Sequence, residues 1–395
     1  MNKNFKRQIL QCRLNLVKIC VLSCLLVLMV SWSKDSKQNQ KLVQFVFTSD
    51  SHFGVKRITF QGDSNVFANV VNAAMVSKMN SLQYATLPND GGVNAGKIIG
   101  GIDYLINTGD IANREEKGIQ NSATSWNQFT TVYLNGANLK NRLNQKAEIL
   151  LLAGNHDISN AIGHYKEMKP LTDNCSMVGI YNYMFPSTPK TTYNYQYSTD
   201  KVHYSRDIAG IHIVFLNMWP DSCERIWIEK DLKAVSKTEP VLLFTHDQPN
   251  VESKHFTNPN GSHTINSADK FENIIPEVFK DGVKTSDPSV IEQRSFVAFL
   301  KAHQNIKAYF NGNDHENIFY DYKGPDNDIN LKTFQVDSPM KGNISGHDES
   351  KMSFQFVTID TQTKTMTVRE CLWNAVPSNP SAPIVWGASM TISLE

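Results

Sequence analysis

The chain alternates short apolar runs with amphipathic stretches over most of its length. Six apolar runs, each bounded by turn residues, predict buried strands at 42–50, 101–110, 147–157, 210–218, 240–247 and 306–314. Helical patterns lie between them at 66–82, 124–134, 225–236 and 291–303. Because strands and helices alternate along the chain, the pattern favours an α/β fold.

The C-terminal part has a different periodicity. Apolar and polar positions alternate over 352–361 and 365–373, which predicts two antiparallel strands that close a second sheet. After residue 41 there is no boundary rich in Pro, Gly or Ser, and no internal repeat. We therefore expect residues 42–395 to form one domain that includes this β-rich portion.

The N-terminus stands apart from the rest of the chain. A basic stretch leads into an apolar run at 19–33, and Ser31 and Ser33 are small residues at the spacing of a cleavage site. This is the layout of a secretory signal peptide, and the run is shorter than the roughly 20 residues of a membrane span. The pattern predicts a signal peptide at 1–33 and a polar linker at 34–41, so the protein is expected to be secreted or periplasmic. An uncleaved membrane anchor is the alternative.

Charge and cysteine content exclude several classes of protein. Lys and Arg number 39 against 38 Asp and Glu, without a dense basic run after the leader, so no nucleic-acid partner is expected and a nuclease is disfavoured. Beyond the leader the chain keeps Cys175, Cys223 and Cys371, with no CxxC spacing. That excludes a disulfide scaffold and a cysteine-based zinc site. One disulfide bond or three free thiols both stay open.

Polar clusters follow five of the six predicted strands. The clusters are Asp50 with His52, Asp110, Asn155 to Asp157, His246 with Asp247, and Asp314 with His315. Turn formation explains one such cluster, since Asp and Asn favour turns, but it does not explain five. Ligands bind at the carboxyl ends of strands in α/β folds. The sequence therefore predicts a binding site at this edge.

The clusters form an ordered set of motifs. The chain has D-x-H at 50–52, G-D-x-x-[DN] at 109–113, G-N-H-[DE] at 154–157, His246 after an apolar strand, and Gly-Asn-Asp-His at 312–315 in place of G-H-x-H. Over roughly residues 42–320 the set resembles the calcineurin-like metallophosphoesterase superfamily, which includes purple acid phosphatases. The resemblance implies a four-layer α/β/β/α sandwich, in which two mixed sheets face each other with a metal site at the carboxyl ends of the strands.

The resemblance also implies roles for the motif residues. Two divalent metal ions (Mn, Mg, Zn or Fe) would be held, the first by Asp50, His52 and His315, the second by Asn155 and His246, with Asp110 bridging them. His156 would stabilise the transition state or protonate the leaving group, with Asp157 orienting its ring. Asn113 would contact the ligand residues without binding a metal ion itself. The implied reaction is hydrolysis of a phosphomonoester or phosphodiester by metal-activated water.

Position 313 departs from the family pattern. Asn313 stands where the family has a histidine that binds the second metal. An amide oxygen suits hard cations such as Mg²⁺, Mn²⁺ or Ca²⁺ better than it suits Zn²⁺ or Fe²⁺. Three interpretations stay open. Asn313 binds the second metal and shifts its preference, or water replaces it and the second site is weak, or the second metal is lost and the protein is a secreted binding protein with little or no turnover.

The substrate is left open by the sequence. Insertions at 113–147, 158–200 and 247–295 would surround the site, but they contain no nucleotide-binding or sugar-binding motif. Arg57, Arg114 and Lys254 are positive charges near the motifs that read as ordinary surface residues. The expected partner is a phosphoester of unknown identity, with a membrane only if the leader is retained. The oligomeric state is equally open.

Overall fold

The computed structural model describes residues 41–113, 120–158, 175–196, 199–251, 279–280, 283–284 and 288–395. The predicted signal peptide and nearly all of the linker lie outside the described residues, as do Arg114 and Lys254. Among the described helices, none combines the length and the apolar character that crossing a membrane requires.

The first sheet has six strands in the order β16-β15-β14-β1-β4-β5. Its strands are β1 (Leu42–Thr48), β4 (Tyr104–Asn107), β5 (Glu148–Leu151), β14 (Ser353–Asp360), β15 (Thr365–Leu372) and β16 (Val385–Ser393). Strands β1, β4 and β5 run parallel, while β14 pairs antiparallel with β1, and β15 and β16 continue this antiparallel half. The carboxyl ends of the three parallel strands therefore meet at one edge.

The second sheet has six strands in the order β12-β13-β11-β8-β7-β6. Its strands are β6 (Tyr204–Ile208), β7 (Ile211–Phe215), β8 (Val241–Phe244), β11 (Ile306–Asn311), β12 (Ile318–Tyr322) and β13 (Leu331–Gln335). The four central strands are parallel, and β6 and β12 are antiparallel edges. Two mixed sheets in an α/β fold were expected, and this prediction is confirmed.

The expected place of the C-terminal strands was wrong. Strands β14 and β15 extend the first sheet through β1, and they do not close the second sheet. Alternation of apolar and polar positions shows that a segment is a strand, but it does not show which open edge the strand joins. The pairing of β1 with β14, from Leu42 opposite Asp360 to Phe47 opposite Gln355, settles the partner.

The two sheets pack against each other through phenylalanine rings. Phe45 and Phe47 of β1 meet Phe244 of β8 and Phe310 of β11 edge-on, with ring centroids 5.4–6.2 Å apart. The rings of Phe244 and Phe310 stack at 4.4 Å, and all four side chains are fully buried. Such ring pairs contribute about 0.5–1.5 kcal/mol each beyond the burial of their area. This contact fixes β1 over the centre of the second sheet.

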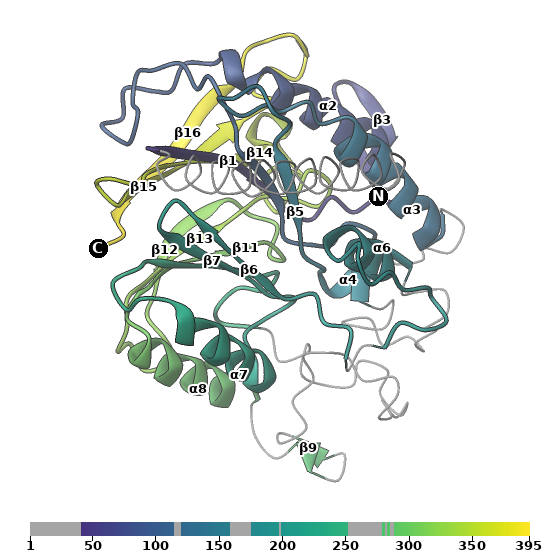
Figure 1. The fold of residues 1–395 in the computed structure, drawn as a ribbon. Helices are drawn as coiled ribbons and strands as arrows, with labels where there is room; N and C mark the ends of the chain where they lie inside the picture. The colour runs from purple at the N-terminus through teal and green to yellow at the C-terminus, as the bar shows by residue number, and fades with distance from the viewer. Residues whose placement is uncertain are drawn as a thin grey trace, which may run out of the picture.

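Helices cover the outer faces of the sheets (Figure 1). Helix α2 (Ala68–Ser81) and helix α3 (Ser122–Phe129) lie beside the first sheet, whereas α7 (Ser222–Asp231) and α8 (Pro288–Ala302) lie on the far side of the second. Shorter elements are the hairpin β2 (Lys56–Phe60) and β3 (Asp63–Phe67), the π-helix η2 (Thr130–Asn135), α4 (Asn155–Ile158), α6 (Cys175–Met184), the 3₁₀ turns η1 (Leu82–Tyr84), η3 (Leu232–Ala234) and η6 (Glu349–Lys351), and the pair β9 (Phe279–Lys280) and β10 (Val283–Lys284). The four-layer order of the expected sandwich stays a prediction.

All six predicted strands and four predicted helices are present, but the strands are shorter than expected. Strand β1 ends at Thr48 and β4 at Asn107, so Asp50 and Asp110 lie in loops. Both residues have positive φ, of 54° and 50°, which no extended strand accommodates. The polar end of each predicted strand is therefore a separate turn.

An ion pair between a buried arginine and an aspartate at the surface ties a loop to the first sheet. Arg369 of β15 is fully buried, and its guanidinium donates to both carboxylate oxygens of Asp90 at 2.7 and 2.9 Å. It also donates to the carbonyl oxygen of Val93 at 3.0 Å. Because the loop supplies the acceptors, the guanidinium depends on it for charge compensation.

Asp90→Ala is expected to lower the free energy of unfolding by about 3–5 kcal/mol, because it leaves a buried cation unpaired. Asp326→Ala is the matched control, since the Arg294–Asp326 pair is also bidentate but its side chains are 58% and 48% exposed. That variant should lose far less stability, because solvent screens an exposed pair. Urea unfolding followed by circular dichroism measures both, and equal losses would contradict the assignment.

Candidate metal centre

Five loops from the two sheets converge on one place. Asp50 follows β1, Asp110 follows β4, Asn155 follows β5, His246 follows β8 and His315 follows β11. The loops are joined directly: Asp50 N–H donates to the Gly109 carbonyl at 2.9 Å, and Gly312 N–H donates to the His246 carbonyl at 3.0 Å. The sequence order predicted this meeting, and the structure brings the side chains together.

The His246 ring links the two sheets at the site. Its Nδ1 atom lies 3.0 Å from the carbonyl oxygen of Thr108, which follows β4 in the other sheet. Since that carbonyl can only accept, Nδ1 carries a proton, and Nε2 is the nitrogen that faces the site. With its other nitrogen held by backbone, the ring can bind a metal ion through Nε2 once that atom gives up its own proton.

Five of the candidate ligands have a left-handed backbone. The φ angles are 54° at Asp50, 44° at His52, 50° at Asp110, 66° at Asn313 and 56° at His315. Such conformations are uncommon for residues other than glycine, and they cost free energy that surrounding contacts must offset. Their concentration on the residues that converge here, and the rigid hydrogen bonding around them, are typical of a functional site.

One half of the site is a compact group of carboxylates and imidazoles. One ligand atom from each of Asp50, His52, Asp110 and His315 lies within 4.8 Å of all the others. His315 Nε2 is 3.1 Å from Asp50 Oδ1 and 3.1 Å from His52 Nε2. His52 Nε2 is 3.6 Å from Asp50 Oδ1. Mixed nitrogen and oxygen donors at this spacing suit a divalent cation.

The Asp110 carboxylate faces both ways. Its Oδ2 atom lies 3.7 Å from His52 Nε2 in the group above, and its Oδ1 atom lies 3.5 Å from His246 Nε2. On that second side, His246 Nε2 is 3.1 Å from Asn155 Oδ1. This is the arrangement that a carboxylate shared between two cations requires.

Two motif glycines are required by close packing. A Cβ atom at Gly154 would collide with Asp110 Oδ1 and lie 2.6 Å from His246 Cε1. A Cβ atom at Gly312 would collide with Asp50 Oδ2 and lie 2.6 Å from the Cβ atom of Ser49. The glycines therefore let the loops approach the ligands without displacing them.

Electrostatics at the site favour positive charge. Burial disfavours the Asp50 carboxylate, but His315 and His52 outweigh this effect, and the pKa of Asp50 lies well below its usual range. Burial likewise opposes a charged His246, yet Asp110 and Asp50 raise the pKa of His246 to about 9. The negative potential that stabilises a proton there also stabilises a cation.

The remaining pKa shifts at the site are caused mainly by burial. Burial and the nearby Lys341 ammonium lower the pKa of His52 well below its usual value, so its ring is neutral, as a metal ligand must be. Burial also raises the pKa of Asp110, and burial with the Asp110 charge raises the pKa of Asp157 to about 7.

The donor set fits a metal ion. Asp50 Oδ1 is fully buried and has no hydrogen-bond donor within the described structure, although two imidazole nitrogens face it. A buried carboxylate oxygen without a donor is costly. A cation among the Asp50, His52, Asp110 and His315 donors would satisfy that oxygen and both imidazole lone pairs together.

His156 lies at the mouth of the site. Its backbone N–H donates to Asp110 Oδ1 at 2.8 Å, and its Nε2 atom is 3.7 Å from Asp110 Oδ2. The side chains of His156 and His315 are 10% and 20% exposed, whereas those of His52 and His246 are fully buried. His156 and His315 are therefore the rings of the site that solvent reaches.

Asp157 has a different place from the one expected. Its Oδ2 atom accepts the backbone N–H groups of Ile111 and Gly154, both at 3.0 Å, and its Oδ1 atom accepts that of Ala112 at 2.9 Å. Because these backbone bonds occupy both oxygens, Asp157 holds the Asp110 loop against the Asn155 loop. The expectation that it orients the His156 ring is corrected accordingly.

Asn313 is fixed by two hydrogen bonds. Its backbone N–H donates to Asp50 Oδ2 at 3.0 Å, and its side-chain Nδ2 donates to Gln248 Oε1 at 2.9 Å. Gln248 is buried and comes two residues after His246. The backbone of Asn313 thus orients Asp50, while Gln248 sets the direction of the Asn313 amide.

Two features near the site were not predicted from the sequence. Asn113 is buried as expected behind the ligands, but its Oδ1 atom accepts a hydrogen bond from Lys341 Nζ. No spacing in the sequence links Lys341 to the earlier motifs, since 228 residues separate it from Asn113. Arg57, expected to be an ordinary surface charge, is instead buried and donates to the carbonyl oxygens of Pro339 and Ser345.

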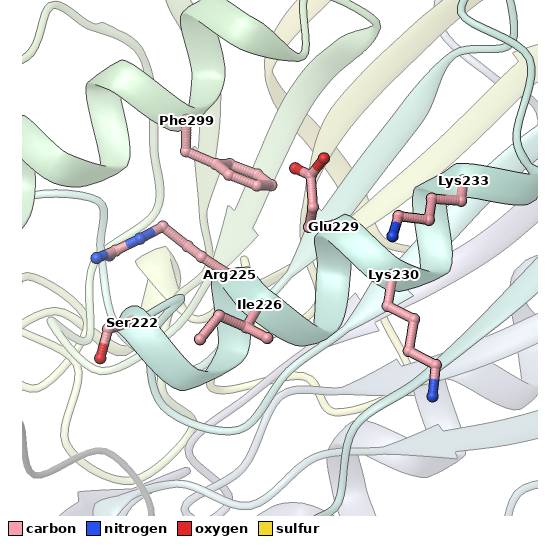
Figure 2. A pocket seen from close by; sticks show the side chains of 7 residues that line it. All are labelled: Ser222, Arg225, Ile226, Glu229, Lys230, Lys233 and Phe299. Atoms are coloured by element: carbon pink, nitrogen blue, oxygen red, sulfur yellow. The ribbon is translucent and has the colours of Figure 1, made fainter.

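A pocket beside the outer helices of the second sheet belongs to neither group of ligands (Figure 2). It is lined by Ser222, Arg225, Ile226, Glu229, Lys230, Lys233 and Phe299, from α7, η3 and α8. Arg225 there pairs with Glu292 at 2.9 Å, and Glu229 lies 2.6 Å from His303 Nε2. Arg225 and Glu229 thus have partners, and the pocket shares no residue with the candidate metal centre.

A buried polar network lies beneath the candidate ligands. Tyr133 OH donates to Asn72 Oδ1 at 2.9 Å, and Ser51 Oγ lies 3.2 Å from the same hydroxyl. Asn107 Nδ2 donates to Ser51 Oγ at 3.1 Å, and Asn107 Oδ1 accepts the Gly109 N–H at 3.0 Å. Ser51 lies between Asp50 and His52, so the network connects both ligand loops to helix α2 and the π-helix η2.

Tyr133→Phe is expected to lower metal affinity about tenfold, the lower end of the effect of losing an outer partner of metal ligands. The hydroxyl is the junction of the network, and its loss frees the loop of Asp50 and His52. Mn²⁺ titration calorimetry measures the change. Tyr195→Phe is the control, because that buried hydroxyl bonds the Asp200 carbonyl away from the site. Equal metal affinity in both variants would contradict the positioning role.

Comparisons with known proteins identify a family that this chain resembles. The family model for calcineurin-like phosphoesterases matches residues 43–276, more than half of the chain. Solved structures that match are a conserved uncharacterized protein, titled a predicted phosphoesterase, from Streptococcus pneumoniae TIGR4 and a single mutant of Vps29 from Entamoeba histolytica. Both are 8% identical; they cover 90% and 89% of this chain and 99% and 100% of their own, with TM-scores of 0.31 and 0.32. No curated protein matches this chain. On the family match, the chain belongs to the calcineurin-like phosphoesterase family.

Proposed function

We propose that this protein is an exported, metal-dependent phosphoesterase that hydrolyses a phosphomonoester or a phosphodiester. The observation that carries the proposal is the convergence of Asp50, His52, Asp110 and His315, with ligand atoms within 4.8 Å of one another on four left-handed residues. Export rests on the basic and then apolar pattern of residues 1–33. The near balance of charge supports a small or neutral-surfaced substrate over nucleic acid.

Two divalent cations fit the donors. Asp50, His52 and His315 would hold one ion, Asn155 and His246 the other, and the two oxygens of Asp110 point to opposite sides, as sharing requires. When bound, such ions neutralise charge on the phosphoryl group and make water a strong nucleophile at neutral pH.

The chain's own residues would supply a proton to the substrate and hold the ligand loops in position. His156 is a partly exposed imidazole outside the proposed ligand set, and its Nε2 atom would donate a proton or a hydrogen bond to a phosphoryl or leaving-group oxygen. The backbone bond from His156 N–H to Asp110 fixes that ring relative to the shared ligand. Asp157 keeps the two loops together through backbone N–H groups.

The second cation is expected to be a hard one. Asn155 and Asn313 contribute amides where histidine would favour Zn²⁺ or Fe²⁺, so Mg²⁺ or Mn²⁺ is the proposed occupant. The hydrogen bond to Gln248 uses Asn313 Nδ2 and leaves Oδ1 for a cation. Because an amide is a weaker ligand than imidazole, the second candidate function is a protein in which this site is weak and which binds phosphoesters with little turnover.

His156→Ala is expected to lower kcat for an aryl phosphate about 10²- to 10⁴-fold, because it removes the proton donor and leaves the ligands in place. Metal content per chain, measured by mass spectrometry, should not change. His303→Ala is the control, since His303 pairs with Glu229 on the outer helices. If the wild-type chain hydrolyses neither an aryl phosphate nor an aryl phosphodiester with any divalent ion, the binding protein is the correct function.

Asn313→His is expected to tighten the second metal and to move the ion preference toward Zn²⁺ or Fe²⁺, because imidazole is the better ligand for these ions. Competition titrations of Mn²⁺ against Zn²⁺ measure this preference. Asn343→His serves as the control, as Asn343 N–H bonds the His315 carbonyl from outside the donor set. An unchanged preference in Asn313→His would remove Asn313 from the second site.

A further inference from the structure

Strand β16 is an open edge of the first sheet (Figure 1). It pairs with β15 on one side, and no strand in the described part of the chain pairs with its other side. The strand is 9 residues long, and residues 385–394 include no charged residue and no proline. A long uncharged edge is a template for pairing with another chain, and proteins usually protect such edges with charge or proline.

The other edge strands of the two sheets, as far as the structure describes them, are protected in this way. Strands β5, β6 and β12 have 4, 5 and 5 residues. Each also carries charge, from Glu148 in β5, from Arg206 and Asp207 in β6, and from Asp321 in β12. Short and charged edges resist pairing with a further strand. Strand β16 is the exception among them.

A β-bulge closes the first part of β16. The pairing with β15 is irregular at Gly387 and Ala388, which together face the single residue Glu370. Ala388 N–H donates to Glu370 Oε2 at 3.1 Å, and a Cβ atom at Gly387 would collide with that carboxylate. The chain thus satisfies this backbone donor itself. Regular strand pairing is left over residues 389–393.

The register shows which backbone groups face the open edge. Leu394 N–H donates to the Lys364 carbonyl at 2.7 Å, so these two residues form a hydrogen-bonded pair. Hydrogen-bonded and non-hydrogen-bonded pairs alternate along an antiparallel ladder. Ser389, Thr391 and Ser393 are therefore in the non-hydrogen-bonded pairs with β15. Their N–H and C=O groups point away from β15, toward the open edge.

The side chains of residues 389–393 follow a symmetric pattern. The segment Ser-Met-Thr-Ile-Ser alternates polar and apolar residues and has the same pattern in both directions, with Thr391 at its centre. The three polar side chains are exposed, whereas Met390 is half-buried and Ile392 is buried against the core. A second copy of the segment, running antiparallel about Thr391, therefore places polar residues opposite polar ones and apolar residues opposite apolar ones.

We propose that β16 pairs antiparallel with β16 of a second copy of this chain, with Thr391 on the two-fold axis, so that the first sheet continues across a dimer. The outward backbone groups of Thr391 bond those of Thr391 in the second copy, and Ser389 pairs with Ser393 in the same way. Met390 and Ile392 lie opposite each other and extend one apolar face. No charges meet within the paired segment, and its self-complementary pattern is what a two-fold interface requires.

Sedimentation velocity of the purified full chain over a wide range of concentration tests the proposal, and we expect a dimer that dissociates on dilution. Thr391→Lys should raise the dissociation constant of the dimer at least about tenfold, because it places two ammonium groups opposite each other. Added salt should reverse part of this loss. Thr59→Lys is the matched control, since it adds the same charge at an exposed position of the β2 hairpin and should leave the dimer unchanged.

A second variant and hydrogen exchange give independent evidence. Because the Thr391 N–H points away from β15, Thr391→Pro removes a bond of the interface and none within the sheet. It should abolish the dimer and leave the circular dichroism spectrum unchanged. In the wild type, hydrogen exchange over residues 389–393 should slow as the dimer forms. A chain that stays monomeric at every concentration, a dimer equally weakened by Thr59→Lys, or a dimer unaffected by Thr391→Lys and Thr391→Pro would each overturn the inference.

Discussion

The packing of Phe45 and Phe47 against Phe244 and Phe310 holds the candidate site in register. Each ring is on a strand whose carboxyl end leads into a ligand loop. Contact between the rings therefore brings those loops together at the same edge of the two sheets. A helix-to-sheet contact could slide, but interlocked edge-on rings in a close-packed core resist movement. The Thr108–His246 hydrogen bond then closes the gap between the two sheets at the edge.

Rigid packing also explains how the strained loops persist. Left-handed φ angles at Asp50, His52 and Asp110 would relax if the loops were free. Backbone bonds between the loops, from Asp50 to Gly109 and from His52 to Asp110, prevent this. The three N–H groups that converge on Asp157 have the same effect on the next loop. Stability from the core is therefore used to hold the ligands in place.

Sequence alone predicted the strands and the convergence of the ligand loops, because buried parallel strands are continuous apolar runs and their ends carried Asp, His and Asn in order. His315 was found only through this order, since the family match ends at residue 276. The sheet joined by β14 and β15 was not predictable, because strand periodicity carries no information on the partner edge.

Roles that depend on tertiary contacts also could not be predicted from the sequence. The resemblance implied that Asp157 orients the His156 ring, but the Asp157 carboxylate accepts backbone N–H groups instead. Lys341 and Tyr133 have no motif at all, and they reach the site only because the fold returns them to it. Long-range contacts of this kind leave no periodic signal in the chain.

The two-sided Asp110 carboxylate has a thermodynamic consequence. If both cations bind, one side chain belongs to both sites, so the affinity of each ion depends on the occupancy of the other by the same factor. Ordering of Asp110 by the first ion favours the second, while repulsion between the ions opposes it. The occupancy of the two metal sites thus depends on whether the ordering of Asp110 outweighs the repulsion between the ions. Any anion that weakens this repulsion raises the affinity for both ions.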